Sequence, residues 1–247
     1  MNFKDHFSGH AGAYHQARPT YPEALFDWLG TQTPACSFAW DAGCGNGQAS
    51  VALAAHFAQV YSTDPSAPQI ANAEARPNIT YQVEPAEQCS LADASADLVT
   101  VAQALHWFDH ARFYDEVHRV LKPNGVFAAW TYADCRVTAA IDAIKDRLYV
   151  DLTGPYWPPE RVLVDSGYRT LPFPFTTIEA PAFAMHATWT LAQFLAYLGS
   201  WSASQRYLKD KGVDPVTLVE ADLRNAWGDP ASLRTVNWDF HLRCGRR

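Results

Sequence analysis

The sequence DAGCGNG at residues 41–47 constrains the fold of this chain more than any other segment. Three alternating glycines follow an apolar run that ends at Trp40, and a pattern typical of a helix begins at Gln48. Glycine adopts positive φ without strain and lets the backbone approach a ligand closely, because it has no side chain. A loop of this kind at the carboxyl end of a strand in an open α/β sheet is where nucleotide-like ligands bind. The segment therefore predicts a strand, a ligand-binding loop and a helix.

The spacing of the glycines indicates the kind of ligand. The fingerprint of dinucleotide-binding proteins needs its third glycine one residue after Gly47, where this chain has Gln48. Asp64 lies 21 residues after Gly43, where a ribose-hydroxyl acceptor belongs. Its carboxylate can accept hydrogen bonds from both hydroxyls of an adenosyl ribose, and it would repel a 2′-phosphate, which disfavours NADP. The alternative is that Asp64, followed by Pro65, only caps a helix.

Composition and charge narrow the class of protein. A chain of 247 residues with 48% hydrophobic residues can bury one core and an appended cap. It has no apolar run of membrane-spanning length and no signal-peptide pattern, and its five scattered cysteines predict reduced thiols in a cytoplasmic protein. The net charge is −7, and the one basic cluster is Arg243, Arg246 and Arg247. We therefore expect a small-molecule substrate, with neither nucleic acid nor membrane as a partner.

Short β-like runs alternate with helical patterns through the first half, which predicts a doubly wound α/β sheet of mostly parallel strands. The predicted strands are Ser37–Trp40, Val60–Thr63, Ile79–Val83, Ala96–Ala102 and Val126–Trp130. Helices are predicted over Gln48–Ala58 and from about Asp109 to the sequence KPNG at 122–125, where proline and Asn-Gly end a helix. Pro22 is expected in the first turn of another helix and Ser66 at a helix cap.

The alternation breaks after Tyr132. The later predicted elements are helices at Ala139–Leu152, Leu191–Leu198, Ser202–Lys209 and Pro215–Trp227, and strands at Phe175–Ala184 and Thr235–Arg243. Helices inserted between two late strands predict a cap over the carboxyl edge of the sheet, where a substrate pocket would lie. We expect one domain over 1–247, with an N-terminal segment at 1–32, a core at 33–132, a cap with the late strand at 133–230 and the last strand at 231–247.

Candidate ligand-binding residues follow the first and third predicted strands. Asp41 either orients an amino group of the ligand or holds loop amides in an Asx-type turn. Backbone groups near Ala86 and the side chain of Glu87 either read the edge of an adenine or face water, as loop residues of this kind often do.

The sequence QALHWF at 103–108 follows the fourth predicted strand. The small Ala104 lets the backbone approach a ligand, beside Gln103. Trp107 and Phe108 either form a wall against a cation or pack a helix on the sheet. His106 is the candidate catalytic residue, as a base or a substrate contact, and the alternative is a structural histidine.

Two other site classes lack their required residues. His106 and His110 are four residues apart, but Trp107 stands where the zinc hydrolase motif requires glutamate. We therefore predict no metal site. The chain also has no G-x-S-x-G sequence, so it has no nucleophile elbow of a serine hydrolase.

Together these residues resemble the class I S-adenosylmethionine-dependent methyltransferases of the type-11 group, and more narrowly the trans-aconitate methyltransferase-like branch. The matching segments are 41–47, 64–66, 86–87, 103–108 and 121–125. The resemblance extends over the whole chain through Phe7, Tyr14, Arg18, Pro19, Tyr21 and Pro22 at the front, and Trp201, Ser202, Tyr207, Trp227 and the terminal strand at the back.

The resemblance implies a Rossmann-like seven-stranded sheet with an inserted antiparallel last strand, a helical cap and S-adenosylmethionine (SAM) as methyl donor. S-adenosylhomocysteine would be the product. Segment 1–32 would be a lid over the cofactor and 33–132 the SAM-binding core, with Tyr14 and Arg18 near the methionyl carboxylate. The residues expected to bind the cofactor are Tyr14, Arg18, Asp41, Gly43, Gly45, Gly47, Asp64, Pro65, Ala86, Glu87, Gln103, Ala104 and Trp107.

We therefore expect methyl transfer to an oxygen or nitrogen of a small molecule, with a carboxylate as one candidate acceptor because it needs no general base. Tyr132, Trp157 and Trp201 are expected to form walls of the substrate pocket, with core packing as the alternative. Two other functions stay open. A nicotinamide-dependent oxidoreductase is disfavoured by Gln48. A methyltransferase-like module could also bind SAM without transferring methyl groups.

Overall fold

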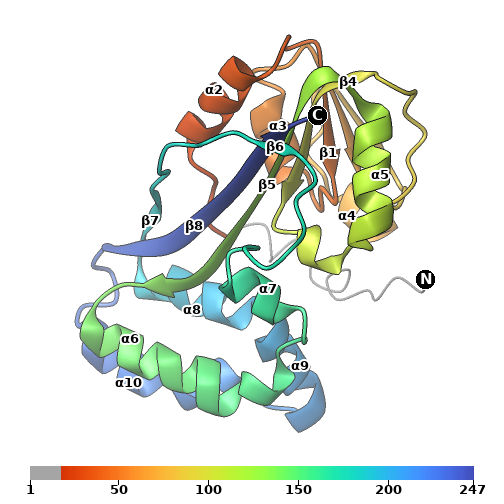
Figure 1. The fold of residues 1–247 in the computed structure, drawn as a ribbon. Coiled ribbons are helices and arrows are strands. Elements are labelled where there is room, and N and C mark those ends of the chain that lie inside the picture. Colours follow the sequence, from red (N-terminus) through yellow and green to blue (C-terminus); the bar gives the residue numbers. More distant parts are fainter. Residues whose placement is uncertain (1–17) are drawn as a thin grey trace.

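The computed structural model describes residues 18–247, which form one sheet covered by helices, with a helical cap at one end (Figure 1). The strands are β1 (Phe38–Ala42), β2 (Gln59–Thr63), β3 (Ile79–Gln82), β4 (Ala96–Ala102), β5 (Leu121–Arg136), β6 (Thr176–Thr177), β7 (Met185–Trp189) and β8 (Arg234–Arg246). Their order is β3-β2-β1-β4-β5-β8-β6, and β7 pairs with β8 outside this order. Strands β1 to β5 pair in parallel, while β8 is antiparallel to its neighbours. The predicted fold class is confirmed, with eight strands in place of seven.

Helices cover both faces of the sheet. They are α2 (Glu23–Gln32), α3 (Gln48–Leu53), α4 (Ala67–Ala71), η2 (Leu105–Trp107), α5 (His110–Val120), α6 (Ala139–Asp146), η3 (Arg147–Leu152), η4 (Gly154–Tyr156), α7 (Arg161–Asp165), α8 (Leu191–Gly199), α9 (Ser202–Lys211), η5 (Pro215–Leu218) and α10 (Glu220–Trp227). Successive residues of a strand point to opposite faces. Ala39 and Leu98 accordingly pack with residues of α2 and α3, while Trp40 and Val99 pack with residues of α5.

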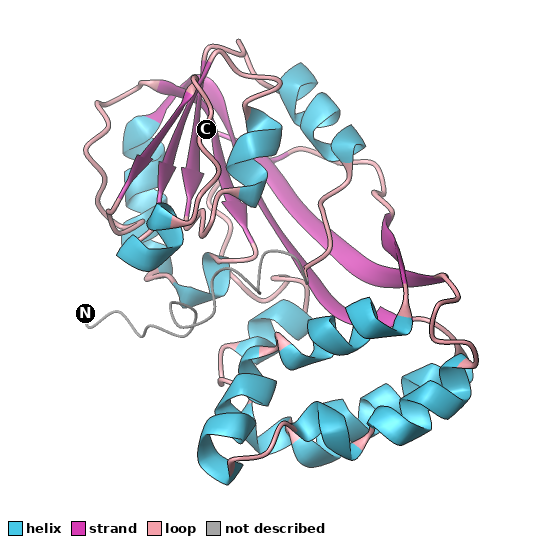
Figure 2. Ribbon diagram, turned by 180° about the vertical axis from the view of Figure 1, so that it is seen from behind, coloured by secondary structure: helices cyan, strands magenta, loops and turns pink. Residues whose placement is uncertain are grey.

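The cap is carried by the two longest strands. β5 and β8 continue past the other strands, and the helices α6, α8 and α10 lie at their far ends (Figures 1 and 2). A second core forms there, in which Tyr132 of β5 and Trp238 of β8 pack with Phe194, Tyr197 and Trp227 of the cap helices. The cap therefore has its own apolar interior and is fixed to the core through one antiparallel pair.

Local signals correctly marked several ends of elements. The Ser66 side chain caps α4 by accepting a hydrogen bond from Gln69 N, and the Asp109 side chain caps α5. Helix α5 ends at Val120, and Asn124 has the positive φ of 63° that the Asn-Gly pair predicts. These features depend on a few neighbouring residues, which is why the sequence predicts them.

The predicted strand Phe175–Ala184 is wrong over most of its length. Only Thr176–Thr177 pair with β8, and residues 178–184 have no regular structure. Pro181 has no N–H to donate to a strand ladder. Pairing with β8 resumes as β7, beyond the predicted range.

Three predicted helices also differ in extent. The helix predicted over Gln48–Ala58 ends at Leu53, and the one predicted over Ala139–Leu152 becomes a π-helical turn after Asp146. The helix predicted over Pro215–Trp227 divides into η5 and α10, because Val219 leaves helical geometry with a φ of −120°.

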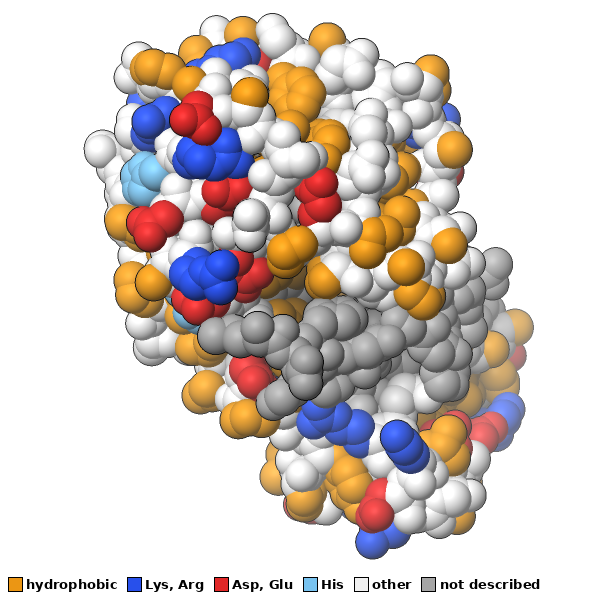
Figure 3. Space-filling model, turned by 90° about the vertical axis from the view of Figure 1, so that its right-hand side faces the viewer, with side chains coloured by type: hydrophobic (Ala, Val, Ile, Leu, Met, Phe, Trp, Pro, Cys, Tyr) orange, Lys and Arg blue, Asp and Glu red, His pale blue; other side chains and the backbone are white. Residues whose placement is uncertain are grey.

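Two further features of the described residues are the lengths of the helices and the charges on the surface. Within residues 18–247, no helix combines the length and apolar character that membrane crossing requires. On the face drawn in Figure 3, acidic and basic side chains lie interspersed over the part of the molecule that carries the sheet.

One buried carboxylate joins the starts of two central strands. Asp97 in β4 is 1% exposed, and its Oδ2 accepts hydrogen bonds from the backbone N–H groups of Ser37 (3.1 Å) and Phe38 (3.0 Å). Its Oδ1 accepts a hydrogen bond from Lys122 Nζ at 2.8 Å. Because buried amides need acceptors, Asp97 stabilises the position of β1 against β4.

We expect Asp97→Ala to lower the free energy of unfolding by about 3 kcal/mol, because two amides and a lysine lose a buried partner. Urea denaturation followed by circular dichroism measures this change. Asp93→Ala is the matched control, since Asp93 pairs with Arg119 but its side chain is 81% exposed, and its loss should cost less than about 1 kcal/mol. Equal unfolding midpoints for the two variants would contradict the assigned role.

Candidate functional site

The glycine loop connects β1 to α3 and is fastened to the end of β2. The amides of Gly43 and Cys44 donate to Thr63 O at 2.8 and 3.0 Å. Gly43, Gly45 and Gly47 have φ values of 68°, 56° and 83°, so the expectation of positive φ at the three glycines is confirmed. Such values are strained for any residue with a side chain.

The three glycines differ in what surrounds them. A Cβ at Gly43 would lie 2.8 Å from both Ala104 Cβ and Phe108 Cζ, and one at Gly47 would collide with Tyr81. Among residues 18–247, no atom lies within 4 Å of the position that a Cβ at Gly45 would take. The outer two glycines therefore allow close packing, while Gly45 has no such packing requirement against the described part of the chain.

Asp64 contacts the glycine loop directly. Its Oδ2 accepts a hydrogen bond from Gly45 N at 2.9 Å, and its Oδ1 accepts one from Ser66 N at 2.8 Å. The two sequence features thus meet in space, beside Pro65 at the end of β2. A carboxylate has about four acceptor positions, and these two amides are among the partners of Asp64.

Asp41 lies beneath the loop and is fully buried. Its carboxylate accepts hydrogen bonds from Ser50 Oγ at 2.6 Å and Thr100 Oγ1 at 3.0 Å. Burial raises its pKa to about 6, against the lowering effect of these two hydroxyls. These two hydroxyls belong to α3 and β4, so Asp41 holds the helix and the strand together under the loop. A contact with a ligand's amino group stays a prediction.

The loops after β3 and β4 are joined to each other and to β5. Glu87 Oε1 accepts a hydrogen bond from Asp109 N at 2.8 Å, next to the buried Ala86. Gln103 has a φ of 57°, and its side chain makes hydrogen bonds to both Tyr132 N (2.9 Å) and Tyr132 O (3.0 Å). Strained residues of this kind are frequent at functional sites.

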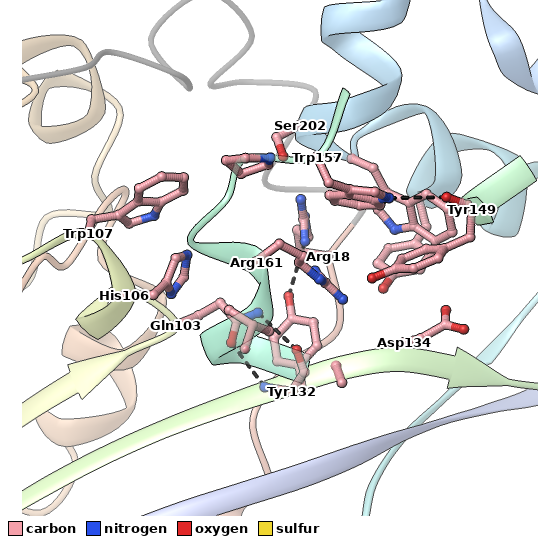
Figure 4. A pocket seen from close by; sticks show the side chains of 15 residues that line it. Arg18, Gln103, His106, Trp107, Tyr132, Asp134, Tyr149, Trp157, Arg161 and Ser202 are labelled. Atoms are coloured by element: carbon pink, nitrogen blue, oxygen red, sulfur yellow. Dashed lines mark hydrogen bonds between the residues drawn. The ribbon is translucent and has the colours of Figure 1, made fainter. Parts of the chain in front are cut away.

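A cavity of about 60 Å³ lies between this edge of the sheet and the cap (Figure 4). Its lining residues are Arg18, Gln103, His106, Trp107, Tyr132, Ala133, Asp134, Tyr149, Trp157, Pro158, Arg161, Val164, Tyr197, Trp201 and Ser202. The structure therefore brings together the catalytic candidate, the three predicted pocket residues and several predicted cofactor residues. Tyr14 lies outside the described residues.

The aromatic residues that line the cavity also pack the apolar core of the cap. The rings of Trp157 and Trp201 lie 5.7 Å apart, and Tyr149 lies within 5.6 Å of each. Trp201 is 4% exposed, and Tyr132 packs in the same apolar cluster. Tyr132, Trp157 and Trp201 therefore line the cavity and also pack the cap, and their role as walls of a substrate pocket stays a prediction.

Two guanidinium groups line the cavity. Arg18 Nη1 donates to Tyr132 Oη at 3.3 Å, and Nη2 donates to Ser200 O at 3.1 Å. Arg161 lies over the Trp157 ring at 4.7 Å, and its Nε donates to Asp165 Oδ1 at 2.8 Å. These contacts hold both cations in defined positions at the cavity.

The acid in the cavity lining has strong partners of its own. Asp134 pairs with the fully buried Lys145, and Arg136 lies 3.6 Å from the same carboxylate oxygen. The negative charge of Asp134 is thus compensated from outside the cavity. Arg161 is paired in the same way with Asp165, so the charged groups that the lining presents are Arg18, Asp134 and Arg161, each with partners of its own.

Several cavity residues were not expected from the sequence. They are Asp134, Tyr149, Arg161 and Tyr197. The one available signal was the spacing of Trp157 and Arg161, which are four residues apart and are in contact in the structure. Nothing in the local sequence indicates that this pair faces the end of β5.

His106 is buried at the cavity wall, with 8% of its surface exposed. Its Nδ1 lies 2.8 Å from Tyr168 Oη. Burial, with a smaller contribution from the charge of Arg161, lowers its pKa to about 3. His106 is therefore neutral at physiological pH, which argues against a role as a cationic acid.

Comparison with known proteins identifies the family. The methyltransferase-domain family matches residues 40–129, which contain the glycine loop, Asp64 and the segment after β4. A Dictyostelium discoideum protein classed as a methyltransferase is 32% identical over 97% of this chain and 94% of its own. A solved structure assigned as a type II methyltransferase from Anaeromyxobacter dehalogenans is 49% identical, with a TM-score of 0.87 over 93% of this chain and 97% of that one.

The chain therefore belongs to the class I SAM-dependent methyltransferases. A Saccharomyces cerevisiae relative that is 26% identical, over 82% of each chain, is also classed as SAM-dependent. The family level of the predicted resemblance is confirmed, and the protein is a methyltransferase, not a nicotinamide-dependent oxidoreductase. The trans-aconitate methyltransferase-like branch stays a prediction.

We expect Gly43→Ala to lower the free energy of unfolding by about 1–3 kcal/mol more than Gly45→Ala. Both variants carry the strain of positive φ, but only the first pushes a methyl group into Ala104 and Phe108. Chemical denaturation of the two variants measures the difference. Equal losses would show that packing does not require Gly43.

Proposed function

We propose that this enzyme transfers the methyl group of SAM to an oxygen or nitrogen of a small molecule, and that a carboxylate is the acceptor the cavity favours. The observation that carries this proposal is the placement of Arg18 and Arg161 in one aromatic cavity beside the glycine loop. Guanidinium groups pair well with carboxylates, because their donors match the two oxygens.

The loop region fits an adenosyl group. We propose that the loop glycines and Asp64 hold the adenosine, with Asp64 at the ribose, because Asp64 accepts a hydrogen bond from Gly45 N and so lies directly against the glycine loop. Pro65, Ala86 and Glu87 would border the adenine. When bound, SAM supplies an electrophilic methyl group on a sulfonium centre.

The segment after β4 would connect the cofactor to the acceptor. A Cβ at Gly43 would touch Ala104, which shows how closely this segment approaches the loop. Gln103 and Trp107, its neighbours, line the cavity. We propose that Gln103, Ala104 and Trp107 border the methionyl part of SAM.

We propose further that Arg18, with Tyr14, holds the methionyl carboxylate, and that segment 1–32 acts as a lid over the core at 33–132. The contacts of Arg18 with Tyr132 Oη and Ser200 O support this, because they join the N-terminal segment to both β5 and the cap.

Arg161 would bind the acceptor. Its position over Trp157 and its bond to Asp165 hold the guanidinium at the cavity wall, and Lys145 compensates Asp134, the acid among the described lining residues. A cationic amine would meet the positive charge of Arg161 there, whereas an anionic acceptor would be attracted. Small carboxylic acids are therefore the favoured substrate class.

Positioning would provide most of the catalysis. A carboxylate oxygen is already deprotonated at neutral pH and the leaving group is neutral, so the protein needs to align the reacting atoms and exclude water. Holding reactants in line can lower a barrier by roughly 7–11 kcal/mol. The aromatic walls from Tyr132, Trp157 and Trp201 would exclude water from the reacting atoms.

We expect Asp64→Ala to weaken SAM binding by about 1–3 kcal/mol, because a hydrogen-bonding carboxylate at the ribose is lost. Isothermal titration calorimetry with SAM and with S-adenosylhomocysteine measures the change. Asp27→Ala is the control, since the Asp27 side chain on α2 is 68% exposed. Unchanged affinity in a folded Asp64→Ala protein would refute the ribose assignment.

We expect Arg161→Met to raise the KM for a carboxylic acid acceptor by roughly tenfold or more, because a charged hydrogen-bond donor is lost while the apolar stem stays. SAM affinity should not change. The acceptor comes from a screen of carboxylic acids, phenols and amines with methyl-labelled SAM. Arg147→Met is the control, because Arg147 is a cap arginine that pairs with Asp222 away from the cavity lining.

Two outcomes of this screen and variant would overturn the carboxylate proposal. One is methylation of amines or phenols without any carboxylic acid. The other is an unchanged acceptor KM in Arg161→Met. SAM binding without methyl transfer to any compound would favour the alternative of a methyltransferase-like module that binds SAM and transfers no methyl group.

A further inference from the structure

His106 and Tyr168 form a buried pair at the edge of the cavity. The His106 ring lies at the cavity wall (Figure 4), whereas Tyr168 is not among the residues that line the cavity. The phenol oxygen is 2.8 Å from His106 Nδ1, and Tyr168 is fully buried. Nδ1 is therefore engaged by the phenol of Tyr168, and Nε2 is the ring nitrogen that can contact a molecule in the cavity.

The backbone that carries Tyr168 is strained. Gly167 and Tyr168 have consecutive positive φ values of 61° and 60°. For a bulky aromatic residue this conformation is a rare exception, and it persists only where surrounding contacts hold it.

Those contacts come from two neighbouring elements. Tyr168 O accepts a hydrogen bond from Arg243 Nη1 of β8 at 2.8 Å, and Tyr168 N donates to Leu163 O of α7 at 2.9 Å. A Cβ at Gly167 would lie 2.6 Å from the His241 ring. The segment is thus fixed between α7 and β8, with the phenol directed at His106.

The protonation states of Tyr168 and His106 indicate which of the two donates the hydrogen bond. Burial raises the pKa of Tyr168 well above its usual value, so the phenol keeps its proton. His106 Nδ1 lies 2.8 Å from this phenol, and the Thr131 hydroxyl, which donates to Gln103 Oε1 at 2.6 Å, is also near it. A buried phenol hydrogen needs an acceptor, and we assign Nδ1 as that acceptor, which leaves Nδ1 unprotonated. Because His106 is neutral, its one hydrogen is then on Nε2.

We propose that Tyr168 is a positioning residue that fixes His106 as the Nε2–H tautomer, so that His106 donates a hydrogen bond to an oxygen of the methyl acceptor and does not remove its proton. The second half of this inference depends on the proposed carboxylate acceptor. One carboxylate oxygen would accept the hydrogen bond from Nε2 while the other forms the bond to the methyl carbon. The carbon–sulfur bond breaks, the leaving thioether is neutral, the product is a neutral ester and no proton is released.

The tautomer can be measured without any methyl acceptor. Long-range ¹H–¹⁵N correlation spectra of ¹⁵N-histidine-labelled protein distinguish Nε2–H from Nδ1–H, and the signals of His106 are assigned by their loss in His106→Asn. We expect the Nε2–H form in the unmodified protein and a substantial share of the Nδ1–H form in Tyr168→Phe. A predominant Nδ1–H form or a protonated ring in the unmodified protein would overturn the inference, as would an unchanged spectrum in Tyr168→Phe.

Tyr114→Phe is the matched control for the loss of a buried phenol. Tyr114 is 4% exposed and its hydroxyl donates to Pro172 O at 3.0 Å, so it fastens the segment that follows Tyr168. We expect this variant to lose stability without any change in the His106 tautomer. A changed tautomer in Tyr114→Phe would show that general loosening of the segment is the cause, and this would refute the specific role of Tyr168.

Kinetics with a carboxylic acid found in the screen test the donor role. His106→Asn and His106→Gln keep an N–H donor but provide no base, and at least one should retain clearly more activity than His106→Ala. Tyr168→Phe should lower kcat/KM for the acceptor by roughly three- to tenfold, with SAM affinity unchanged. If both amide variants are as inactive as His106→Ala, the donor role is wrong. If the screen yields no acid, the acceptor proposal fails, but the tautomer measurement still decides the role of Tyr168.

Discussion

The hydrogen bond between the Asp64 carboxylate and the Gly45 amide joins the two features on which the rest of this structure depends. It fixes a loop with three positive φ values against the end of β2, where Gly43 and Cys44 also donate to Thr63 O. Without this contact the loop after β1 and the acid after β2 would be separate features of neighbouring strands. With it they form one rigid edge of the sheet. Among residues 18–247, no atom of this edge lies within 4 Å of the position that a Cβ at Gly45 would take.

The antiparallel pair of β5 and β8 places side chains of the cap close to that edge of the sheet. Gln103, strained at the end of β4, holds the backbone of Tyr132 with its side-chain amide, and β5 then continues for several residues into the cap. The cavity lies at this junction. Its wall carries Arg18 and Arg161, and the buried Lys145 compensates Asp134 from behind. In the proposed function, substrate choice would depend on the cap and cofactor binding on the core.

Sequence reasoning succeeded for the core and lost accuracy in the cap. Strand β4 was predicted with its observed ends, because a short run rich in valine, leucine and alanine that is buried on both faces leaves little ambiguity. Phe175–Ala184 was predicted as one strand, but Pro181 interrupts the ladder and pairing resumes only at Met185. The cap residues Tyr132, Trp157 and Trp201 were correctly predicted to lie together at a cavity, although their aromatic character alone could not distinguish wall from core.

The sequence by itself determined the class of this protein, because the evidence is local. Three glycines that need positive φ and an acid at a fixed distance are readable from the printed residues, and the family comparison agrees with them. Only the tertiary structure decided the arrangement of Arg161 over Trp157 at the cavity and the pairing of His106 with Tyr168. The latter two residues are 62 positions apart and meet because α7 and β8 hold the second against the first. No local pattern encodes such a contact, since it depends on the packing of elements whose order in space differs from their order in the chain.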